Sequence, residues 1–375
     1  MSIFGARSMD SVRFDEEAHN YDALLILSFG GPEGEADVLP FLENVTAGRN
    51  VPRERLLEVA EHYLHFGGVS PINAQNRALV AALERELDTH GPNLPIYFGN
   101  RNWHPFVTGT IQQMRGDGIE RALVFVTSAF SSYSGCRQYR EDVINALEAL
   151  GEGGPAFDKL RVFYNHPGFI EPMIELTSAA LQQIPEERRV DSEIIFTAHS
   201  IPAEMARHSA YERQLAESAR LIAEAIGTKR YRLAYQSRSG SPRVPWLEPD
   251  ILDGLTALQE QGVSDVVVVP LGFVSDHMEV LFDLDFEAQE RARELGMTMI
   301  RAGTAGTHPR FVRMIRELIL ERTTPDPVRL ALGRRGPNHD ICPLNCCLLR
   351  TPSTSVSPRG IPAARSMSSR NKFHG

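Results

Sequence analysis

The chain has 375 residues, 42% of them hydrophobic and 23% charged, and a formal net charge of −9. These values are ordinary for a globular protein with room for two domains, and the acidic balance argues against a nucleic-acid-binding protein. Residues 1–17 contain no apolar segment typical of a signal peptide, and no apolar run approaches the ~20 residues of a membrane span, so we expect a cytoplasmic protein without an integral membrane segment.

Strand-like and helix-like segments alternate along the chain, as apolar runs and 3.6-residue apolar spacing indicate. In the first half the predicted strands are 23–29, 96–99, 122–127 and 160–164, and the predicted helices are 51–65, 72–87, 138–150 and 170–183. In the second half the predicted strands are 194–197, 232–235, 266–269 and 299–302, and the predicted helices are 212–226, 249–261, 277–295 and 310–320. This alternation is typical of an α/β fold with parallel sheets.

The two halves resemble each other in sequence. Residues 24–32 match residues 194–202, and residues 118–126 match residues 262–270, in the same order and at similar spacing. We therefore predict two Rossmann-like, doubly wound domains whose parallel sheets face each other across a cleft. The predicted parts are an N-terminal domain at 20–185, a C-terminal domain at 186–322, an extension at 323–350 and, from its Ser-, Pro- and Arg-rich composition, a disordered tail at 351–375.

Nucleotide-binding signatures are missing from this sequence. No strand is followed by G-x-G-x-x-G, and the chain contains no G-x-x-x-x-G-K-[ST]. We therefore expect a Rossmann-like fold that uses neither NAD nor ATP.

A histidine and a glutamate follow two of the predicted buried strands. His199 comes directly after strand 194–197, and strand 266–269 leads into a loop with His277 and Glu279. A lone histidine is more often a packed core residue, but ligands in open α/β sheets bind at the carboxyl ends of strands. Two strand ends that each carry a proton-handling group predict two walls of one site.

The segment after the second of these strands carries a row of acidic residues. Glu279, Asp283 and Glu287 have the spacing i, i+4 and i+8, which places them on one face of a helix. Such a row is usually a solvated surface. At the entrance of an apolar site it also suits the passage of protons or of a hard cation.

The four cysteines are unevenly distributed. Cys342, Cys346 and Cys347 lie within six positions of one another, and Cys136 lies far away in sequence. A disulfide framework is unexpected in a reducing compartment, whereas clustered cysteines are typical of a metal or iron–sulfur site. The spacing leaves three alternatives open, namely an iron–sulfur cluster, a four-thiolate zinc site and unliganded thiols.

Several motifs together resemble the ferrochelatases. They are residues 25–32, 67–71, 197–202, 236–238, 245–247, 272–279 and 281–285, and the likeness extends in the correct order over about 20–322. The resemblance implies two Rossmann-like domains around a porphyrin site. It also implies insertion of ferrous iron into a porphyrin without ATP or an organic cofactor.

The resemblance also implies roles for individual residues. His199 would meet the pyrrole nitrogens and Glu279 would face it as the second iron-binding group, while Asp283, Glu287 and His277 would form a path for protons or metal. The expected porphyrin contacts are Ser70, Tyr139, Phe29 and Arg49. The pattern of Cys136, Cys342, Cys346 and Cys347 resembles the actinobacterial branch, whose members hold a 2Fe-2S cluster and act on coproporphyrin III.

Some positions depart from the family pattern. Phe29 replaces a tyrosine that can cap the metal in some members, and Thr46 and Ala47 stand where some members carry paired arginines, which leaves Arg49 nearby. The alternatives are a cobalt or nickel chelatase of another tetrapyrrole and a non-catalytic haem-binding carrier. We expect this protein to be a monomer.

Overall fold

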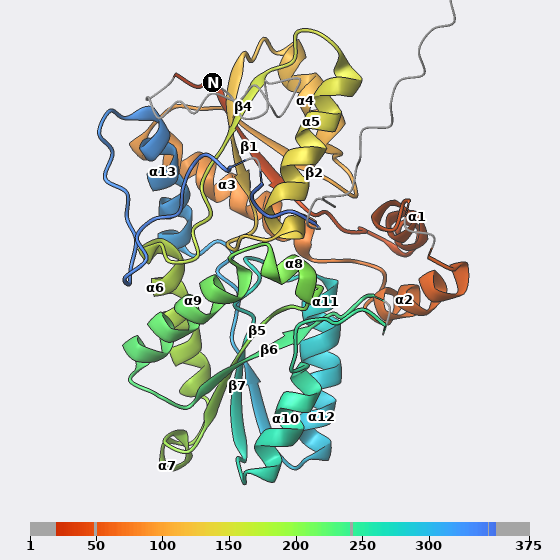
Figure 1. Ribbon diagram of the computed structural model, residues 1–375, viewed down its shortest axis with the longest axis vertical. Coiled ribbons are helices and arrows are strands. Elements are labelled where there is room, and N and C mark those ends of the chain that lie inside the picture. Colours follow the sequence, from red (N-terminus) through yellow and green to blue (C-terminus); the bar gives the residue numbers. More distant parts are fainter. Residues whose placement is uncertain (1–19, 49–50, 241–242, 344, 350–375) are drawn as a thin grey trace, which may run out of the picture.

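The computed structural model describes residues 20–48, 51–240, 243–343 and 345–349, and it contains two four-stranded parallel sheets, one above the other in Figure 1. The strand orders are β2-β1-β3-β4 and β6-β5-β7-β8. The two sheets thus repeat one topology, which confirms the predicted parallel α/β fold. The strands are β1 (Ala23–Ser28), β2 (Ile96–Asn100), β3 (Arg121–Val126), β4 (Ala156–Lys159), β5 (Glu193–His199), β6 (Tyr231–Gln236), β7 (Asp265–Val269) and β8 (Thr298–Arg301).

Helices cover both faces of each sheet, because alternate residues of the central strands are apolar and buried on opposite faces. Two of the helical stretches, η2 and η3, are π-helical. The helices are α1 (Glu35–Val45), α2 (Arg53–His65), α3 (Ile72–His90), α4 (Val107–Gly116), η2 (Tyr133–Arg137), α5 (Gln138–Leu150), α6 (Pro167–Leu181), α7 (Glu186–Arg189), α8 (Ala203–Arg207), α9 (Tyr211–Ile226), α10 (Ile251–Glu260), α11 (Met278–Val280), η3 (Leu281–Ala288), α12 (Gln289–Glu294) and α13 (Pro309–Thr323).

The predicted strand at 160–164 is wrong. The fourth strand of the first sheet is β4, which pairs with β3, and residues 160–164 have no regular structure. The apolar run misled the prediction because it reflects burial: Leu160, Val162 and Phe163 pack into the core. β4 was missed because Asp158 and Lys159 made it look exposed, although both are buried.

The predicted helix at 277–295 is one helical run with a widened centre. Its first turn is α11 and its last part is α12, and the eight residues of η3 between them form a π-helix. π-helical turns are rare and occur frequently at functional sites. This run follows β7 and carries the acidic row identified in the sequence.

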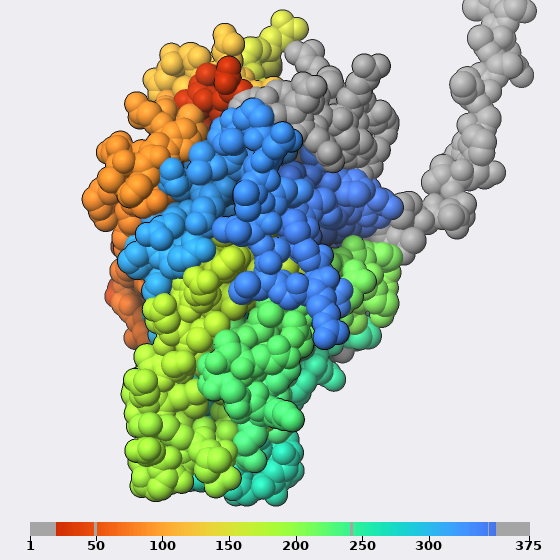
Figure 2. Space-filling view, turned by 90° about the vertical axis from the view of Figure 1, so that its left-hand side faces the viewer, coloured from red at the N-terminus to blue at the C-terminus, as the bar shows by residue number. Residues whose placement is uncertain are grey.

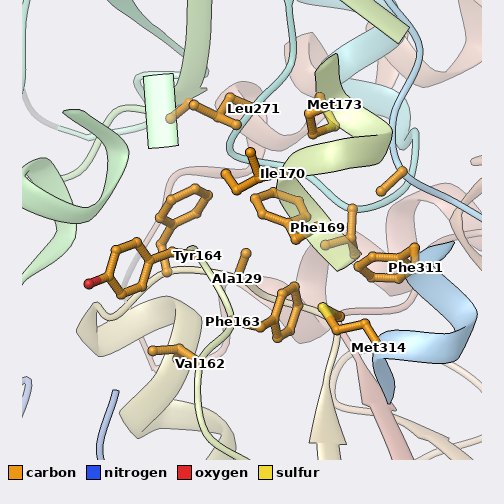
Figure 3. Packing of buried hydrophobic residues seen from close by; sticks show 14 of the residues in the cluster. Ala129, Val162, Phe163, Tyr164, Phe169, Ile170, Met173, Leu271, Phe311 and Met314 are labelled. Carbon is orange, nitrogen blue, oxygen red and sulfur yellow. The ribbon is translucent and has the colours of Figure 1, made fainter. Parts of the chain in front are cut away.

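One apolar core connects the two halves. α6 packs against β7, β8 and α9 of the second half, and α13 packs against α3 of the first half as well as against α6. Phe163, Phe169 and Phe311 meet where these elements join, with ring centroids 5.6–6.4 Å apart (Figure 3). The described part of the chain from α13 to residue 349, in blue, lies over both halves (Figure 2). The halves therefore share one core and hold each other in a fixed arrangement.

Across the described ranges, each helix is either too short or too polar to cross a bilayer.

Candidate active site

His199 is the last residue of β5, and its backbone and ring are both held. The Tyr211 hydroxyl donates to the His199 carbonyl (3.0 Å), and the ring Nδ1 lies 2.5 Å from the Ser200 carbonyl oxygen. A carbonyl oxygen can only accept a hydrogen bond, so Nδ1 carries the proton. Nε2 is then the free basic nitrogen of the neutral ring.

Glu279, on α11, faces that nitrogen. Its carboxylate Oε2 lies 3.6 Å from His199 Nε2 and 3.9 Å from His277 Nδ1. The side chains of His199 and Glu279 are 31% and 43% exposed, so a bound molecule can reach both. The structure thus brings together the two residues that the sequence placed at separate strand ends.

His199 and Glu279 shift each other's pKa. Burial lowers the pKa of His199, but the Glu279 carboxylate outweighs it and the net pKa is raised. Burial raises the pKa of Glu279, yet the positive charge that His199 can carry brings the net pKa below the usual value. His277 has a lowered pKa, chiefly because it is buried. Glu279 therefore stays ionised beside His199 and stabilises an imidazolium there.

Asp283 occupies a different environment from the other acidic residues of the row. Its carboxylate accepts hydrogen bonds from the Gln236 amide (3.3 Å) and from the Ser237 hydroxyl, and Ser237 is held in the left-handed region (φ 61°). Burial, followed by repulsion from Glu279, raises the pKa of Asp283 to about 7. This carboxyl group therefore exchanges its proton near neutral pH.

Glu287 lies at the outer end of the row. It is exposed, and burial of part of its carboxyl group together with repulsion from Asp250 raises its pKa. Its charge also contributes to the raised pKa of Asp283. The three carboxyl groups are therefore in electrostatic contact from Glu279 outward, in spite of the π-helical centre of the run.

The two halves touch around this row. The Asp276 amide, which follows β7, donates to Gln75 Oε1 of α3 (2.8 Å). His62 of α2 stacks on Phe282 of η3 with ring centroids 3.8 Å apart and an interplanar angle of 6°. α2 therefore packs beside the helical run that carries the acidic row, to its right in Figure 1.

The first half contributes aromatic side chains and one cation. Phe29 follows β1 and is 37% exposed, and Tyr139 of α5 is buried, which raises its pKa to about 12. The Arg101 guanidinium lies between them, 5.8 Å from the Phe29 ring and 5.2 Å from the Tyr139 ring, and its Nε is 3.2 Å from Asp142 Oδ2. Arg101 directly follows β2, so the same strand-end reasoning that found His199 would have found it.

Ser70 and Arg49 are the other two predicted porphyrin contacts. Ser70 is buried beside the turn that follows β1, where its amide donates to the Pro32 carbonyl (2.9 Å). The packing there is tight, because a Cβ at Gly31 would lie 2.7 Å from Ser70 Cβ. Arg49 lies outside the described residues.

The four cysteines meet at a second place. Cys136 in η2 and the three cysteines of the loop after α13 line one small space together with Arg137, Arg140 and Lys159. Cys346 Sγ and Cys347 Sγ are 3.6 Å apart, and Cys347 adopts a left-handed backbone conformation (φ 54°). Contacts with the Cys342 and Cys347 thiols lower the pKa of Cys136 in spite of its burial, and Lys159 acts in the same direction.

This donor set fits a thiolate-bound metal group. Four thiolates are the number that a 2Fe-2S cluster requires, and the three cationic side chains offset their negative charge. Within the described residues, His339, Cys342 and Cys346 also form a group whose ligand atoms all lie within 4.8 Å of one another. Sequence reasoning had not singled out His339.

The comparison with family models and the comparison with curated proteins agree. The family model described as Ferrochelatase matches residues 21–323. The Rhodopirellula baltica protein named ferrochelatase is 56% identical over 345 residues, covering 92% of this chain and 96% of its own length. The coproporphyrin III ferrochelatases of Streptomyces coelicolor and Frankia alni are 50% and 53% identical, covering 93% and 92% of this chain and 99% and 90% of their own.

Among solved structures, the cobalt complex of the sirohydrochlorin chelatase SirB from Bacillus subtilis subspecies spizizenii overlaps with a TM-score of 0.47 at 12% identity. The overlap covers 80% of this chain and 94% of that one.

Proposed function

Because the chain belongs to the ferrochelatase family, we propose that it is a lyase of haem biosynthesis that inserts ferrous iron into coproporphyrin III without ATP or an organic cofactor. The relatives named above support the activity and the substrate. The observation that carries the mechanism is the accessible pair formed by His199 Nε2 and the Glu279 carboxylate, 3.6 Å apart.

The chemistry requires a base and a bent ring. Metallation removes two protons from pyrrole nitrogens, and the lone pairs point out of the ring plane only when the porphyrin is distorted. A site shaped to the bent ring uses binding energy for that distortion. Neutral His199 accepts a pyrrole proton on Nε2, and the Glu279 carboxylate stabilises the imidazolium that forms.

The acidic row can take that proton away. Asp283 changes its charge near pH 7, and Glu287 is exposed at the outer end of the row. His277 lies 3.9 Å from Glu279 and completes the proposed path. The same carboxylates attract a divalent cation, so the path also serves incoming iron.

The Asp283→Asn variant should lose an inflection near pH 7 in the pH profile of kcat/KM for ferrous iron. In the wild type, the rate should rise as pH passes through 7, because the ionised carboxylate attracts iron and accepts a proton. The raised pKa means that Asp283 favours the folded state when protonated and that this contribution is lost as pH rises through 7. Steady-state kinetics between pH 5.5 and 8.5 measure the profile, and the control is Glu290→Gln, an exposed residue of α12 paired with Arg293, which should keep the inflection. An unchanged profile in Asp283→Asn would remove Asp283 from the path.

The experiment that tests the proposed activity is a turnover assay with ferrous, cobalt and nickel ions on coproporphyrin III and protoporphyrin IX. We expect iron to be preferred over the other metals and coproporphyrin III to be preferred in direct competition. Turnover of cobalt or nickel alone, or haem binding without turnover, would favour the alternative chelatase or the carrier.

The first-half residues support recognition of a ring with acidic substituents. Arg101 offers a positive charge near the Phe29 and Tyr139 rings, where a propionate can compete with Asp142 for it and the porphyrin can stack on the exposed Phe29 ring. Ser70 belongs to the same proposed contact set, and Arg49 stays a prediction from the sequence.

Replacing Arg101 with Met should raise KM for coproporphyrin III by about tenfold or more, since a hydrogen bond to a charged group contributes about 1.5–3 kcal/mol. kcat should change less, because Arg101 has no part in the proposed proton transfer. The control is Arg115→Met, on the outer helix α4, where Arg115 donates to the Leu150 carbonyl. Equal KM values for wild type and Arg101→Met would exclude Arg101 from substrate binding.

We also infer that Cys136, Cys342, Cys346 and Cys347 hold a 2Fe-2S cluster, which supplies an electron-accepting centre when bound. The chain's own contribution is to bring one cysteine of the first half to the loop after α13, and to offset the charge with Lys159 and two arginines. A four-thiolate zinc site is the alternative.

The Cys136→Ser variant should be colourless and less stable, because it loses the ligand that attaches the 323–349 segment to η2. Anaerobically purified wild type should be red-brown with two irons per chain, which visible absorption and metal analysis measure. Thermal unfolding gives the stability. Wild-type protein that is colourless and carries one zinc per chain would contradict the cluster and leave the proposed active site untouched.

A cytoplasmic location and a monomeric state are inferred from the sequence, and analytical ultracentrifugation tests the second of them.

A further inference from the structure

A fifth ligand atom stands beside the four cysteines. His339 Nε2 lies 3.9 Å from Cys346 Sγ, and both lie within 4.8 Å of Cys342 Sγ. Two ligands of one metal ion are separated by a similar distance, because metal–ligand bonds of about 2.0–2.3 Å meet at tetrahedral angles. The site therefore has one donor more than a four-coordinate set needs.

The backbone around His339 is held in place on both sides. Arg329 donates to the Asn338 carbonyl (2.7 Å) and pairs with the Asp340 carboxylate (2.8 Å). Gln214 of α9 donates to the Asn338 side chain (3.4 Å). The imidazole is thus presented to the cysteines by a loop anchored to the body of the protein, even though the residue is exposed.

The other residues that line the space together with the four cysteines offer no such reserve ligand. They are Arg137, Arg140 and Lys159, which are cations and poor ligands for iron, and Arg137 donates to the Cys346 carbonyl (3.1 Å). The four thiols are therefore unequal. A lost Cys346 has a neighbouring imidazole that can replace it, whereas for a lost Cys136 the described lining residues offer no substitute ligand.

We propose that His339 is a reserve ligand that binds iron in place of Cys346, an inference that rests on the proposed 2Fe-2S cluster. In the exchange, the iron–sulfur bond to Cys346 breaks and its thiolate takes up a proton, while the neutral imidazole forms an iron–nitrogen bond through Nε2 and keeps its proton on Nδ1. No electron is transferred. The net charge of the site becomes less negative by one, which makes reduction easier, as in centres where histidine replaces cysteine.

Three variants of the full chain test the proposal. Cys346→Ala should keep a cluster, with most of the wild-type iron, an altered visible spectrum and a more positive reduction potential. Cys346→Ala/His339→Ala should lose the cluster, and so should Cys136→Ala. His339→Ala alone should keep the wild-type iron content, because all four cysteines remain.

The readouts are iron per chain, visible absorption and electron paramagnetic resonance of the reduced protein. A cluster in wild type that disappears equally in Cys346→Ala and Cys136→Ala would overturn the proposal, and so would one that survives in the double variant. If Cys346→Ala does not fold, Cys346→Ser keeps a polar side chain of similar size. Pulsed paramagnetic resonance should then detect a histidine nitrogen on its cluster, and its absence would count against the proposal. Wild type without iron would overturn the cluster itself, and the reserve ligand with it.

Discussion

The His199→Ala variant should lose metallation by ~10²-fold or more and keep the wild-type fold. His199 Nε2 is the accessible basic nitrogen at the end of β5, and the Ser200 carbonyl holds the ring in the tautomer that leaves this nitrogen free. The fold should survive because 31% of the side chain is exposed and it adds little to the core. Initial rates of ferrous iron insertion and a thermal unfolding curve measure the two expectations.

The control for this variant is His90→Ala. His90 is an exposed histidine at the end of α3, paired with Glu86 and remote from the site. It should metallate at the wild-type rate. Porphyrin binding, followed by fluorescence quenching, should persist in His199→Ala, since the ring is held by other contacts. Wild-type turnover by a folded His199→Ala protein would show that another group removes the pyrrole protons.

The sequence predicted the second half of the site better than the first. Buried strands that end in His199 or lead into Glu279 are recognisable in one dimension, and the parallel sheet then brings their ends together. Arg101 also follows a strand, but its setting depends on Tyr139, which lies 38 positions later on α5. No local pattern reports that a guanidinium will lie between two rings from different elements.

The i, i+4, i+8 spacing correctly predicted that the three acidic residues form one row. It could not predict that their surroundings, and therefore their pKa values, differ. Glu279 faces a histidine, Asp283 is half-buried and accepts a hydrogen bond from Ser237, and Glu287 is exposed. These surroundings come from β5, from the loop after β6 and from solvent, and helical periodicity contains no information about them. The pKa of about 7 for Asp283 is therefore a property of the tertiary structure.

The packing of helices from one half against the other half also could not be predicted from local sequence patterns. α6 is continuous in sequence with the first half and packs against the second sheet, while α13 packs back against α3. The clustering of Cys342, Cys346 and Cys347 was visible in the sequence. Their approach to Cys136 depends on the path that the chain takes after α13 across both halves (Figure 2).

The Glu279→Gln variant should lose most of its metallation activity, by roughly 10²-fold, although glutamine keeps the shape of the side chain. The loss follows from the charge, because the carboxylate stabilises the imidazolium that forms when His199 takes a proton, and charge-assisted bonds contribute about 1.5–3 kcal/mol. Glu279 also raises the pKa of both His199 and Asp283. Its removal should therefore move the inflection near pH 7 to lower pH.

Glu290→Gln is the matched control for this prediction. Glu290 lies on α12 of the same helical run, where it is exposed and 3.8 Å from Arg293, so its loss should change neither the rate nor the pH profile. Coproporphyrin binding should be retained in both variants, which separates a defect in proton transfer from a defect in substrate binding. Two results would refute the charge argument: a Glu279→Gln protein that turns over like the wild type, or one that loses activity with an unshifted profile. In the second case Glu279 would act through direct contact with iron.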